Sequence, residues 1–518
     1  MITTSFLVCS ALGGVLGYYV FPLFSPWVSC ALAVVLFVAL FCAASGKGVP
    51  ENGKTAAAIP FIPAASFVPT NVSVPAASSV PTASSVPTAA LALGILLALA
   101  GGFAIGQVSG TAARKPFSPG LPPEKVSSLR GILLDDPRTG GHGGLANIRA
   151  TAAGADGLPG CGNVRSSAKG TALVFFPDSS IPRLKEFGRG GEVFVEGAFS
   201  PDAEKRYGKP VFSARSVHLV KPASPAEQFR TAARLSLIGT LSSLDPGGLA
   251  AALLLGSRDG LDRNLERSYR DAGLSHILAL SGMHLSFFSG LLAFFLKRPL
   301  GKKAAAVAGL LFIAIFVFIV GPLPSLVRSA IMYAIGVWAI LSGTPKYTVV
   351  FLGAAFLVQI VFDPASGLSL SFMLSYAALT GLLLLGEKVS FLLNGRSPPA
   401  KAFSASLGAF IAAAPFSAAF FGELRPGGIV SGLVVVPLTS LFMAASLLFL
   451  ACGGFPPAVK ILSFLESVIA KTVSAAALIP GIKTPFFPAL TLSLSLAALV
   501  FFAEKRLRLY RSRLESFD

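Results

Sequence analysis

Long apolar runs recur along most of this chain and alternate with shorter polar segments. Two runs, 5–24 and 27–43, open the chain, and a third occupies 89–105. Further runs follow at 275–296, 304–320, 325–342, 348–363, 367–386, 402–421, 428–451, 457–480 and 487–503. Because roughly 20 apolar residues cross a bilayer as a helix, the pattern predicts a polytopic α-helical membrane protein with about 12 spans. The first run lacks the basic start of a secretory signal, so residues 1–45 are expected to remain as two membrane helices.

The polar segments between the runs differ in kind. Residues 46–88 are rich in Ala, Pro, Ser, Thr and Val and repeat the sequence ASSVPT, which predicts a disordered linker before a third helix at 89–106. Residues 107–222 carry strand-like stretches at 129–134, 170–176, 191–197 and 210–220. They predict a small β-barrel domain of the OB type. Residues 223–274 mix short apolar stretches with dense charge, which predicts amphipathic helices at the membrane interface.

Charge sets the expected orientation. Only 13% of the residues are charged, yet the net charge is +18. Basic residues gather in every second loop of the region 275–503 and in the tail 504–518, with Arg425 and Lys483 as exceptions. The positive-inside rule then places both chain ends in the cytoplasm and the β domain on the outer side of the membrane. The excess also suits a polyanionic partner, and charge alone leaves the two explanations open.

Motifs of common enzymes are missing from the sequence. The five cysteines are scattered, the four histidines have no metal-ligand spacing, and no G-x-x-x-x-G-K-S/T phosphate loop occurs. We therefore expect neither a metal nor another cofactor, and no catalytic activity of the chain itself. Energy for any transport is expected from a cytoplasmic motor or from the proton gradient.

The stretch 253–288 stands out because it places charge directly before an apolar run. Arg258 and Arg270 precede the run, and His276, Ser281, Gly282 and His284 lie in its outer half. The two histidines are eight residues apart, so a continuous helix places them near one face. Arg328 lies four residues into a later run. Ionisable groups at membrane depth are costly and usually face a bundle interior or a water-filled path. For this stretch, function and interface packing remain open alternatives; Arg328 either lines such a path or snorkels to the interface.

Several of these residues fall in a pattern that resembles the ComEC family of competence proteins. The pattern reads LLLG-x-R, then GL, then AGLSH-x-LA-I/L-SG-x-H, and here it occupies 253–284. Shorter matches follow in order at 324–330 (PSLVRSA), at 363–364 (DP) with 370–375 (LSFMLS), and at 414–415 with 421–422. One family position departs from the pattern, because Gly432 stands where an Asn is common, whereas Pro437 is kept.

The resemblance implies a channel that moves single-stranded DNA into the cytoplasm during natural transformation. It makes Arg258, Arg270, His276, Ser281, Gly282, His284 and Arg328 candidates for the DNA path. The basic residues of the β domain become candidates for DNA binding: Arg183, Lys185, Arg189, Arg206 and Lys209. Their alternative role is a solvated basic surface.

The implied partners are single-stranded DNA, membrane lipid, a DNA receptor on the outer side and a cytoplasmic helicase-like motor. Many family members continue into a domain that resembles metallo-β-lactamases, whose H-x-H-x-D-H cluster is not found in these 518 residues. We therefore expect any nuclease on a separate polypeptide.

Two other classes stay open. A small-solute or lipid-precursor transporter is one, with Glu466 as the single acidic residue near the middle of a run after residue 275. A membrane hydrolase that uses Ser281 with His276 or His284 is the other. The sequence shows no acid to orient the histidine of such a site.

Overall fold

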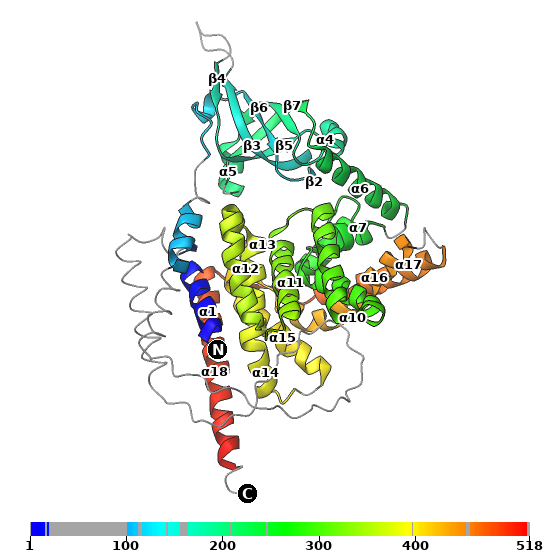
Figure 1. Cartoon of the computed structure of the whole chain (residues 1–518). Helices are drawn as coiled ribbons and strands as arrows, with labels where there is room; N and C mark the ends of the chain where they lie inside the picture. The colour runs from blue at the N-terminus through cyan, green and yellow to red at the C-terminus, as the bar shows by residue number, and fades with distance from the viewer. Residues whose placement is uncertain are drawn as a thin grey trace.

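The fold is described from a computed structural model of the chain. It describes residues 2–15, 18–19, 101–111, 117–140, 143–155, 164–207, 209–244, 247–345, 347–395, 397–451 and 456–514. The predicted linker 46–88, the predicted span 27–43 and most of the predicted span 89–105 lie outside these residues. The described part forms two units, a β domain and a larger bundle of helices, with the C-terminal end of the bundle on the side away from the β domain (Figure 1).

The β domain contains strands β1 to β7 and two short helices. Their bounds are β1 (Ser128–Leu133), β2 (Arg138–Gly140), β3 (Gly143–Ala155), β4 (Val164–Ser167), β5 (Thr171–Phe176), α4 (Ile181–Phe187), β6 (Glu192–Phe199), α5 (Pro201–Tyr207) and β7 (Val211–Lys221). Strand β1 pairs antiparallel with both β3 and β6, β6 pairs with β7, β7 runs parallel to β5, and β5 pairs with β3. Five strands therefore pair in a closed cycle around a core that includes Leu129, Ile148 and Val193.

The longest strand of this domain was missed by the sequence pattern. Strand β3 reads GGLANIRATAAGA and has few β-branched or aromatic residues, which are the usual signal of a strand. It forms nevertheless because it pairs with β1, β2, β4 and β5 along its length. Tertiary pairing outweighs weak local propensity here.

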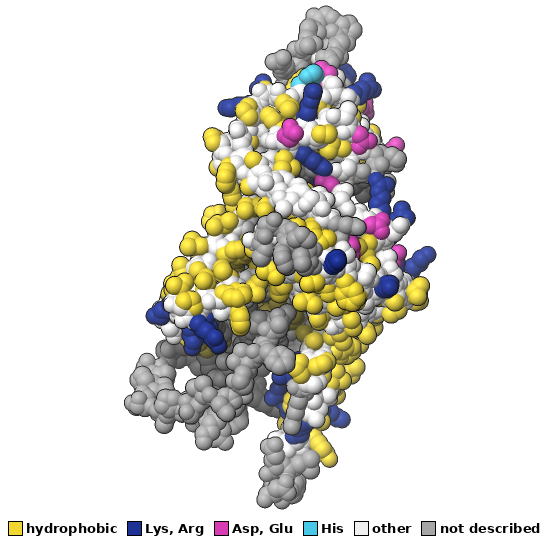
Figure 2. Space-filling model, turned by 90° about the vertical axis from the view of Figure 1, so that its right-hand side faces the viewer, with side chains coloured by type: hydrophobic (Ala, Val, Ile, Leu, Met, Phe, Trp, Pro, Cys, Tyr) yellow, Lys and Arg dark blue, Asp and Glu magenta, His cyan; other side chains and the backbone are white. Residues whose placement is uncertain are grey.

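Six described helices are long and apolar enough to cross a membrane. They span Gly282–Val320, Pro324–Ser342, Leu370–Leu392, Pro398–Phe421, Gly427–Ala451 and Phe486–Arg513. Their surface is rich in exposed apolar side chains such as Phe294, Phe421 and Phe487, and Figure 2 shows hydrophobic side chains over much of the visible face of the bundle. Because water penalises such a surface and lipid does not, the chain is a membrane protein.

The helices of the bundle largely follow the predicted runs, with three differences. Helix α10 (Gly282–Val320) contains most of the predicted run 275–296 and all of the run 304–320, and it breaks at Gly301, with φ 77°, just after Pro299. Helix α12 (Thr348–Phe362) has only 15 residues, and α17 (Pro456–Ala477) contains three charged residues, Lys460, Glu466 and Lys471, so neither is among the six. The total of 12 spans stays a prediction. The bundle also contains α1 (Ile2–Val15), α11 (Pro324–Ser342), α13 (Leu370–Gly381), α14 (Glu387–Leu392), α15 (Pro398–Phe421), α16 (Gly427–Ala451) and α18 (Phe486–Leu514).

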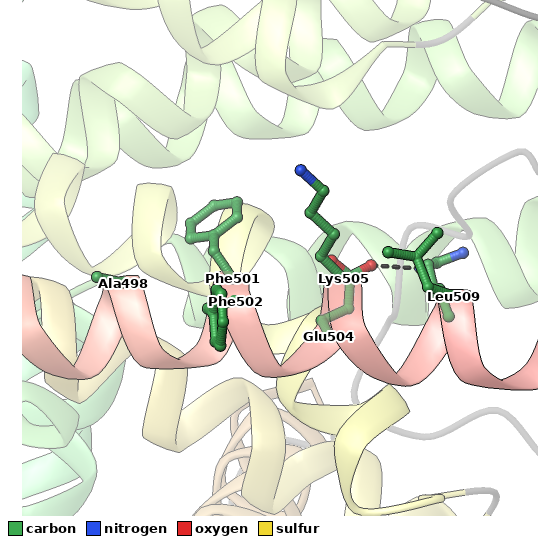
Figure 3. A pocket seen from close by; sticks show the side chains of 7 residues that line it. Ala498, Phe501, Phe502, Glu504, Lys505 and Leu509 are labelled. Atoms are coloured by element: carbon green, nitrogen blue, oxygen red, sulfur yellow. Dashed lines mark hydrogen bonds and ion pairs between the residues drawn. The ribbon is translucent and has the colours of Figure 1, made fainter.

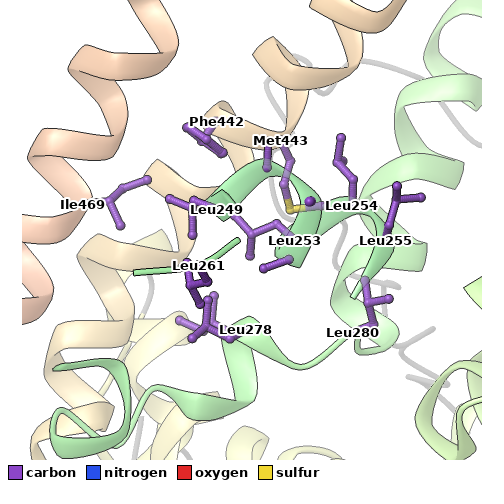
Figure 4. Packing of buried hydrophobic residues seen from close by; sticks show 14 of the residues in the cluster. Leu249, Leu253, Leu254, Leu255, Leu261, Leu278, Leu280, Phe442, Met443 and Ile469 are labelled. Carbon is purple, nitrogen blue, oxygen red and sulfur yellow. The ribbon is translucent and has the colours of Figure 1, made fainter. Parts of the chain in front are cut away.

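The region 223–274 contains α6 (Pro225–Ser242), α7 (Gly247–Leu255) and α8 (Arg263–Asp271). Helix α8 buries Leu265 and Tyr269 and exposes charge. Helix α7 differs from the amphipathic pattern expected for this region, because eight of its nine residues are buried. It lies among the apolar side chains of α16 and α17, such as Phe442 and Ile469 (Figure 4). Its sequence, GGLAAALLL, has no polar face, so complete burial is the favourable state.

A cluster of charged residues joins the β domain to the bundle. The Arg230 side chain of α6 is fully buried and is paired with Asp136, which follows β1, and with Glu227 at 2.6 Å. Arg189 of the β domain pairs with Glu227 at 2.6 Å, and Arg234 donates to the carbonyl of Val320 at 2.6 Å. We call Asp136, Arg189, Glu227, Arg230 and Arg234 the junction cluster.

The junction cluster lowers the pKa of Asp136 and supplies a hydrogen-bond donor to a backbone carbonyl at the C-terminus of α10. Burial favours a raised pKa for Asp136, but hydrogen bonds from Arg230 and the charges of Arg230 and Arg234 outweigh it and lower the pKa below its usual value. The Val320 carbonyl that receives Arg234 is one of the last of α10, where cations are favourable. The cluster therefore fixes the β domain relative to α10.

Candidate nucleic-acid path

The predicted helix 275–296 is broken near its start. After α8 the chain turns at Gly273, which has φ 75°, and forms the four-residue helix α9 (Ser275–Leu278). Ser281 then adopts an extended conformation, with φ −131° and ψ 172°, and α10 begins at Gly282. The prediction that His276 and His284 share one helical face is therefore wrong, because they lie on separate helices.

Ser281 and His284 together cap the N-terminus of α10. The Ser281 backbone N–H donates to His284 Nδ1 at 3.2 Å, and Ser281 Oγ lies 3.1 Å from the same nitrogen. Ser281 Oγ also accepts from the backbone N–H of His284, so the pair forms a capping box. The His284 side chain is fully buried, and its Nε2 has no hydrogen-bond partner among the described residues.

This geometry speaks against a Ser–His hydrolase. Ser281 Oγ caps the N-terminus of α10. Among the described residues, no carboxylate forms a hydrogen bond with the other ring nitrogen of His284, Nε2. A triad needs that third group to orient the histidine. The described residues also contain no group of three or more His, Cys, Asp or Glu side chains that could hold a metal ion.

Gly282 allows helix α11 to approach the start of α10. A Cβ atom at position 282 would lie 2.4 Å from Ser329 Oγ and 2.8 Å from Arg328 Nη2. The two helix ends are also linked by a hydrogen bond of 2.7 Å from Ser325 Oγ to the carbonyl of Leu280. The structure thus brings Ser281, Gly282 and Arg328 together although Gly282 and Arg328 lie 46 positions apart in the sequence.

Arg328 is a buried cation without a carboxylate partner among the described residues. Its side chain donates to the carbonyl of Ser375 and, at 3.3 Å, to Ser329 Oγ, and it lies 5.7 Å from the centre of the Tyr376 ring. The residue is 7% exposed, and its Nε has no hydrogen-bond partner among the described residues. Neutral partners compensate a buried charge only in part, so an anion at this place is favoured.

Two polar residues near Arg328 were missed by the sequence reasoning. Tyr376 of α13 donates to Gln359 Oε1 at 3.1 Å, and Gln359 of α12 donates to the carbonyl of Pro324 at 3.0 Å. The chain of contacts links α11, α12 and α13 around the arginine. An amide inside the apolar run 348–363 is the signal that could have identified Gln359.

The other path candidates lie apart from Arg328. Arg258 is exposed and pairs with Glu266 at 3.1 Å, Arg270 is 63% exposed, and His276 is exposed on α9. Arg425, one of the two exceptions to the predicted charge alternation, donates to the carbonyl of Asp271 at 2.7 Å. It therefore holds the turn at Gly273 in place, which explains a basic residue at this end of the bundle.

The basic candidates of the β domain fall into two groups. Lys185 pairs with Asp259 at 2.7 Å, and Arg189 belongs to the junction cluster, so both attach the domain to the bundle. Arg183 and Lys209 are exposed, and the Arg206 side chain lies outside the described residues. Asp259 also accepts from the Thr139 backbone N–H at 3.2 Å. Burial favours a raised pKa for Asp259, but Lys185 and Thr139 outweigh it and lower the pKa.

A substitution at Gly282 tests the approach of the two helices. Gly282→Ala is expected to displace Arg328, because its methyl group would overlap Ser329 Oγ and Arg328 Nη2. Overpacking of this kind costs about 1–3 kcal/mol. The measurement is the thermal unfolding midpoint of the purified protein in detergent.

The matched control is Gly336→Ala on α11, where the nearest atom to a new Cβ is 3.9 Å away. The second substitution Ser329→Ala should restore part of the loss in Gly282→Ala, because it removes the nearest overlapping atom. Equal midpoints for Gly282→Ala and Gly336→Ala would contradict the close approach.

The fold and this site define a class: a membrane protein with an attached β domain and a buried cation in its helical bundle. Residues 253–508 match the family model of the competence proteins, described as "Competence protein". This segment, just under half of the chain, therefore carries the competence-protein domain of the ComEC family.

Curated relatives agree with this assignment over part of their length. The chain is 27% identical to the ComE operon protein 3 of Bacillus subtilis over 37% of this chain and 25% of that protein. It is 26% identical to the Recombination protein 2 of Haemophilus influenzae over 39% of this chain and 28% of that protein. An uncharacterized protein of Aquifex aeolicus is 30% identical over 43% of this chain and 52% of that protein. The chain thus matches between a quarter and about half of these relatives, and no solved structure matches it.

Proposed function

We propose that this chain forms the path by which single-stranded DNA crosses the bacterial inner membrane during natural transformation. The observation that carries the proposal is Arg328, a buried cation without a carboxylate partner among the described residues, beside the N-terminus of α10. A phosphodiester supplies the missing negative charge without a sequence requirement. The N-terminus of a helix also favours anions.

The β domain suits the first contact with DNA. The proposal of an OB-type barrel is supported by its cycle of five strands, which has one parallel pair and a helix between the third and fourth strands of the cycle along the chain. Such barrels bind single strands through basic and aromatic side chains. Helix α5, which connects β6 and β7, lies on the side of the domain that faces the bundle (Figure 1). We propose Arg183, Arg206 and Lys209 as DNA contacts, and attachment to the bundle as the role of Lys185 and Arg189.

The proposed topology places the β domain outside and both chain ends in the cytoplasm. The end of α18 lies on the opposite side of the bundle from the β domain, and its last turns are basic (Figure 1). This distribution of charge agrees with the positive-inside rule. The proposed partners are a DNA receptor outside, a helicase-like motor inside and a nuclease on a separate polypeptide.

Uptake of labelled DNA by a deletion strain tests the proposal. Without the protein, DNA is expected to bind to the cell surface and remain sensitive to added nuclease, and the wild-type gene is expected to restore protection. If labelled DNA reaches the cytoplasm normally in the deletion strain, the chain does not carry DNA. A small-solute transporter would then become the leading alternative.

A further inference from the structure

Helix α18 is longer than a membrane crossing requires. It spans Phe486–Leu514, 29 residues. At about 1.5 Å per residue, roughly 20 residues cross a hydrocarbon core of about 30 Å, so a crossing that starts at Phe486 ends near Lys505. The turns that follow reach the depth of the lipid headgroups, and they carry Lys505, Arg506, Arg508, Arg511 and Arg513.

Helix α14 adds aromatic and basic contacts to this end of α18. The guanidinium groups of Arg508 and Arg511 lie 4.7 Å and 4.8 Å from the centre of the Phe391 ring. Lys388 Nζ lies 4.6 Å from the centre of the Phe501 ring and 3.2 Å from Glu504 Oε2, and Glu504 also pairs with Arg508. One carboxylate therefore faces several cations, which leaves a positive surface.

A shallow, open groove lies on one face of the same part of α18 (Figure 3). Its apolar lining consists of Ala498, Phe501, Phe502 and Leu509, and its polar lining consists of Glu504, Lys505 and Arg508. Phe501 and Lys505 point to the same side of the helix (Figure 3). Along this side of α18 the lining changes from apolar to positively charged within two helical turns. This change falls at the depth where the acyl chains of the bilayer meet the lipid headgroups.

We propose that this groove binds an anionic phospholipid, with an acyl chain against Phe501 and Phe502 and the headgroup phosphate on Lys505 and Arg508. The charge fits a phosphate, and the order of apolar and basic residues fits the orientation of a lipid in the bilayer. DNA is the other polyanion, but the apolar part of the groove lies on the exposed outer face of α18, where its lining residue Phe502 is 60% exposed. A strand that emerges from inside the bundle does not run along that face.

Native mass spectrometry of the full-length protein from phosphatidylglycerol–phosphatidylcholine nanodiscs tests this site. Wild-type protein is expected to retain phosphatidylglycerol in preference to phosphatidylcholine. Lys505→Gln with Arg508→Gln should lower the affinity for phosphatidylglycerol by roughly tenfold or more, since each basic residue contributes about fivefold. Lys505→Gln alone, which leaves the Arg508–Glu504 pair in place, should show about half of this effect on a logarithmic scale.

The matched control is Lys302→Gln with Lys303→Gln, which removes two exposed positive charges just after the break in α10. This variant should retain phosphatidylglycerol as the wild type does. Equal loss in both double variants, or equal retention in all proteins, would overturn the site. Displacement of bound phosphatidylglycerol by a single-stranded oligothymidylate, lost in Lys505→Gln with Arg508→Gln, would assign the groove to DNA instead. None of these readouts depends on DNA uptake.

Discussion

Arg328→Met is expected to reduce DNA uptake by roughly 100-fold or more while the protein stays at least as stable as the wild type. Hydrogen bonds to charged groups contribute about 1.5–3 kcal/mol, and about 2.7 kcal/mol corresponds to 100-fold. Methionine fills a similar volume without charge, and replacement of a buried, incompletely paired ion by an apolar side chain is often neutral or stabilising. If Arg328 only supported packing, Arg328→Met would instead lower the thermal unfolding midpoint.

The measurement combines nuclease-protected uptake of labelled DNA with the thermal unfolding midpoint of the purified variant. Arg298→Met is the control, since Arg298 is an exposed basic residue near the break in α10. It should leave uptake within about twofold of the wild type, as expected for a solvent-exposed charge. If Arg328→Met supports normal uptake at equal membrane abundance, the buried cation is not part of the DNA path.

Arg230→Met is expected to destabilise the junction cluster by about 3–5 kcal/mol, because it leaves Asp136 and Glu227 without their main counter-charge in a largely buried place. The additional substitutions Asp136→Asn and Glu227→Gln should recover much of this loss. Limited proteolysis between the β domain and α6, together with the unfolding midpoint, measures the effect. A triple variant no more stable than Arg230→Met would show that packing rather than charge explains the loss.

The same cluster predicts a pH dependence with a defined sign. The pKa of Asp136 is lower in the folded protein than its ordinary value. Ionised Asp136 therefore stabilises the fold above the unfolded pKa of about 3.9, and this contribution disappears as the pH falls through the lower folded pKa. The difference in unfolding midpoint between the wild type and Asp136→Asn should be constant above about pH 5 and shrink below pH 4. A difference that grows with acidity would contradict the assigned partners.

Local sequence signals identified several elements correctly and failed where tertiary contacts override them. The strands near 129–134, 170–176, 191–197 and 210–220 carry enough β-branched and aromatic residues to be recognised. Strand β3 does not, since its Ala-rich and Gly-rich sequence is fixed by its neighbours. Helix α7 was assigned to an interfacial region because its short apolar stretch lies beside densely charged sequence, a mixture typical of amphipathic helices at the membrane surface. Its burial depends on α16 and α17, which lie far away in the sequence.

In the candidate site, too, the sequence predicted some features and tertiary packing decided the others. Membrane class follows from apolar runs, because the bilayer penalises charge wherever it occurs, and the residue types at 272–284 and 328 were sufficient to mark them as unusual. Sequence spacing alone treated 275–296 as one helix, whereas the break at Ser281 arises when its side chain and His284 cap α10. The contact between Gly282 and Arg328, the support from Gln359 and Tyr376, and the ion pairs of Lys185 and Arg189 join residues distant in the chain. Periodicity reports only neighbours along one element, so these contacts were decided by the way the helices and the β domain pack together.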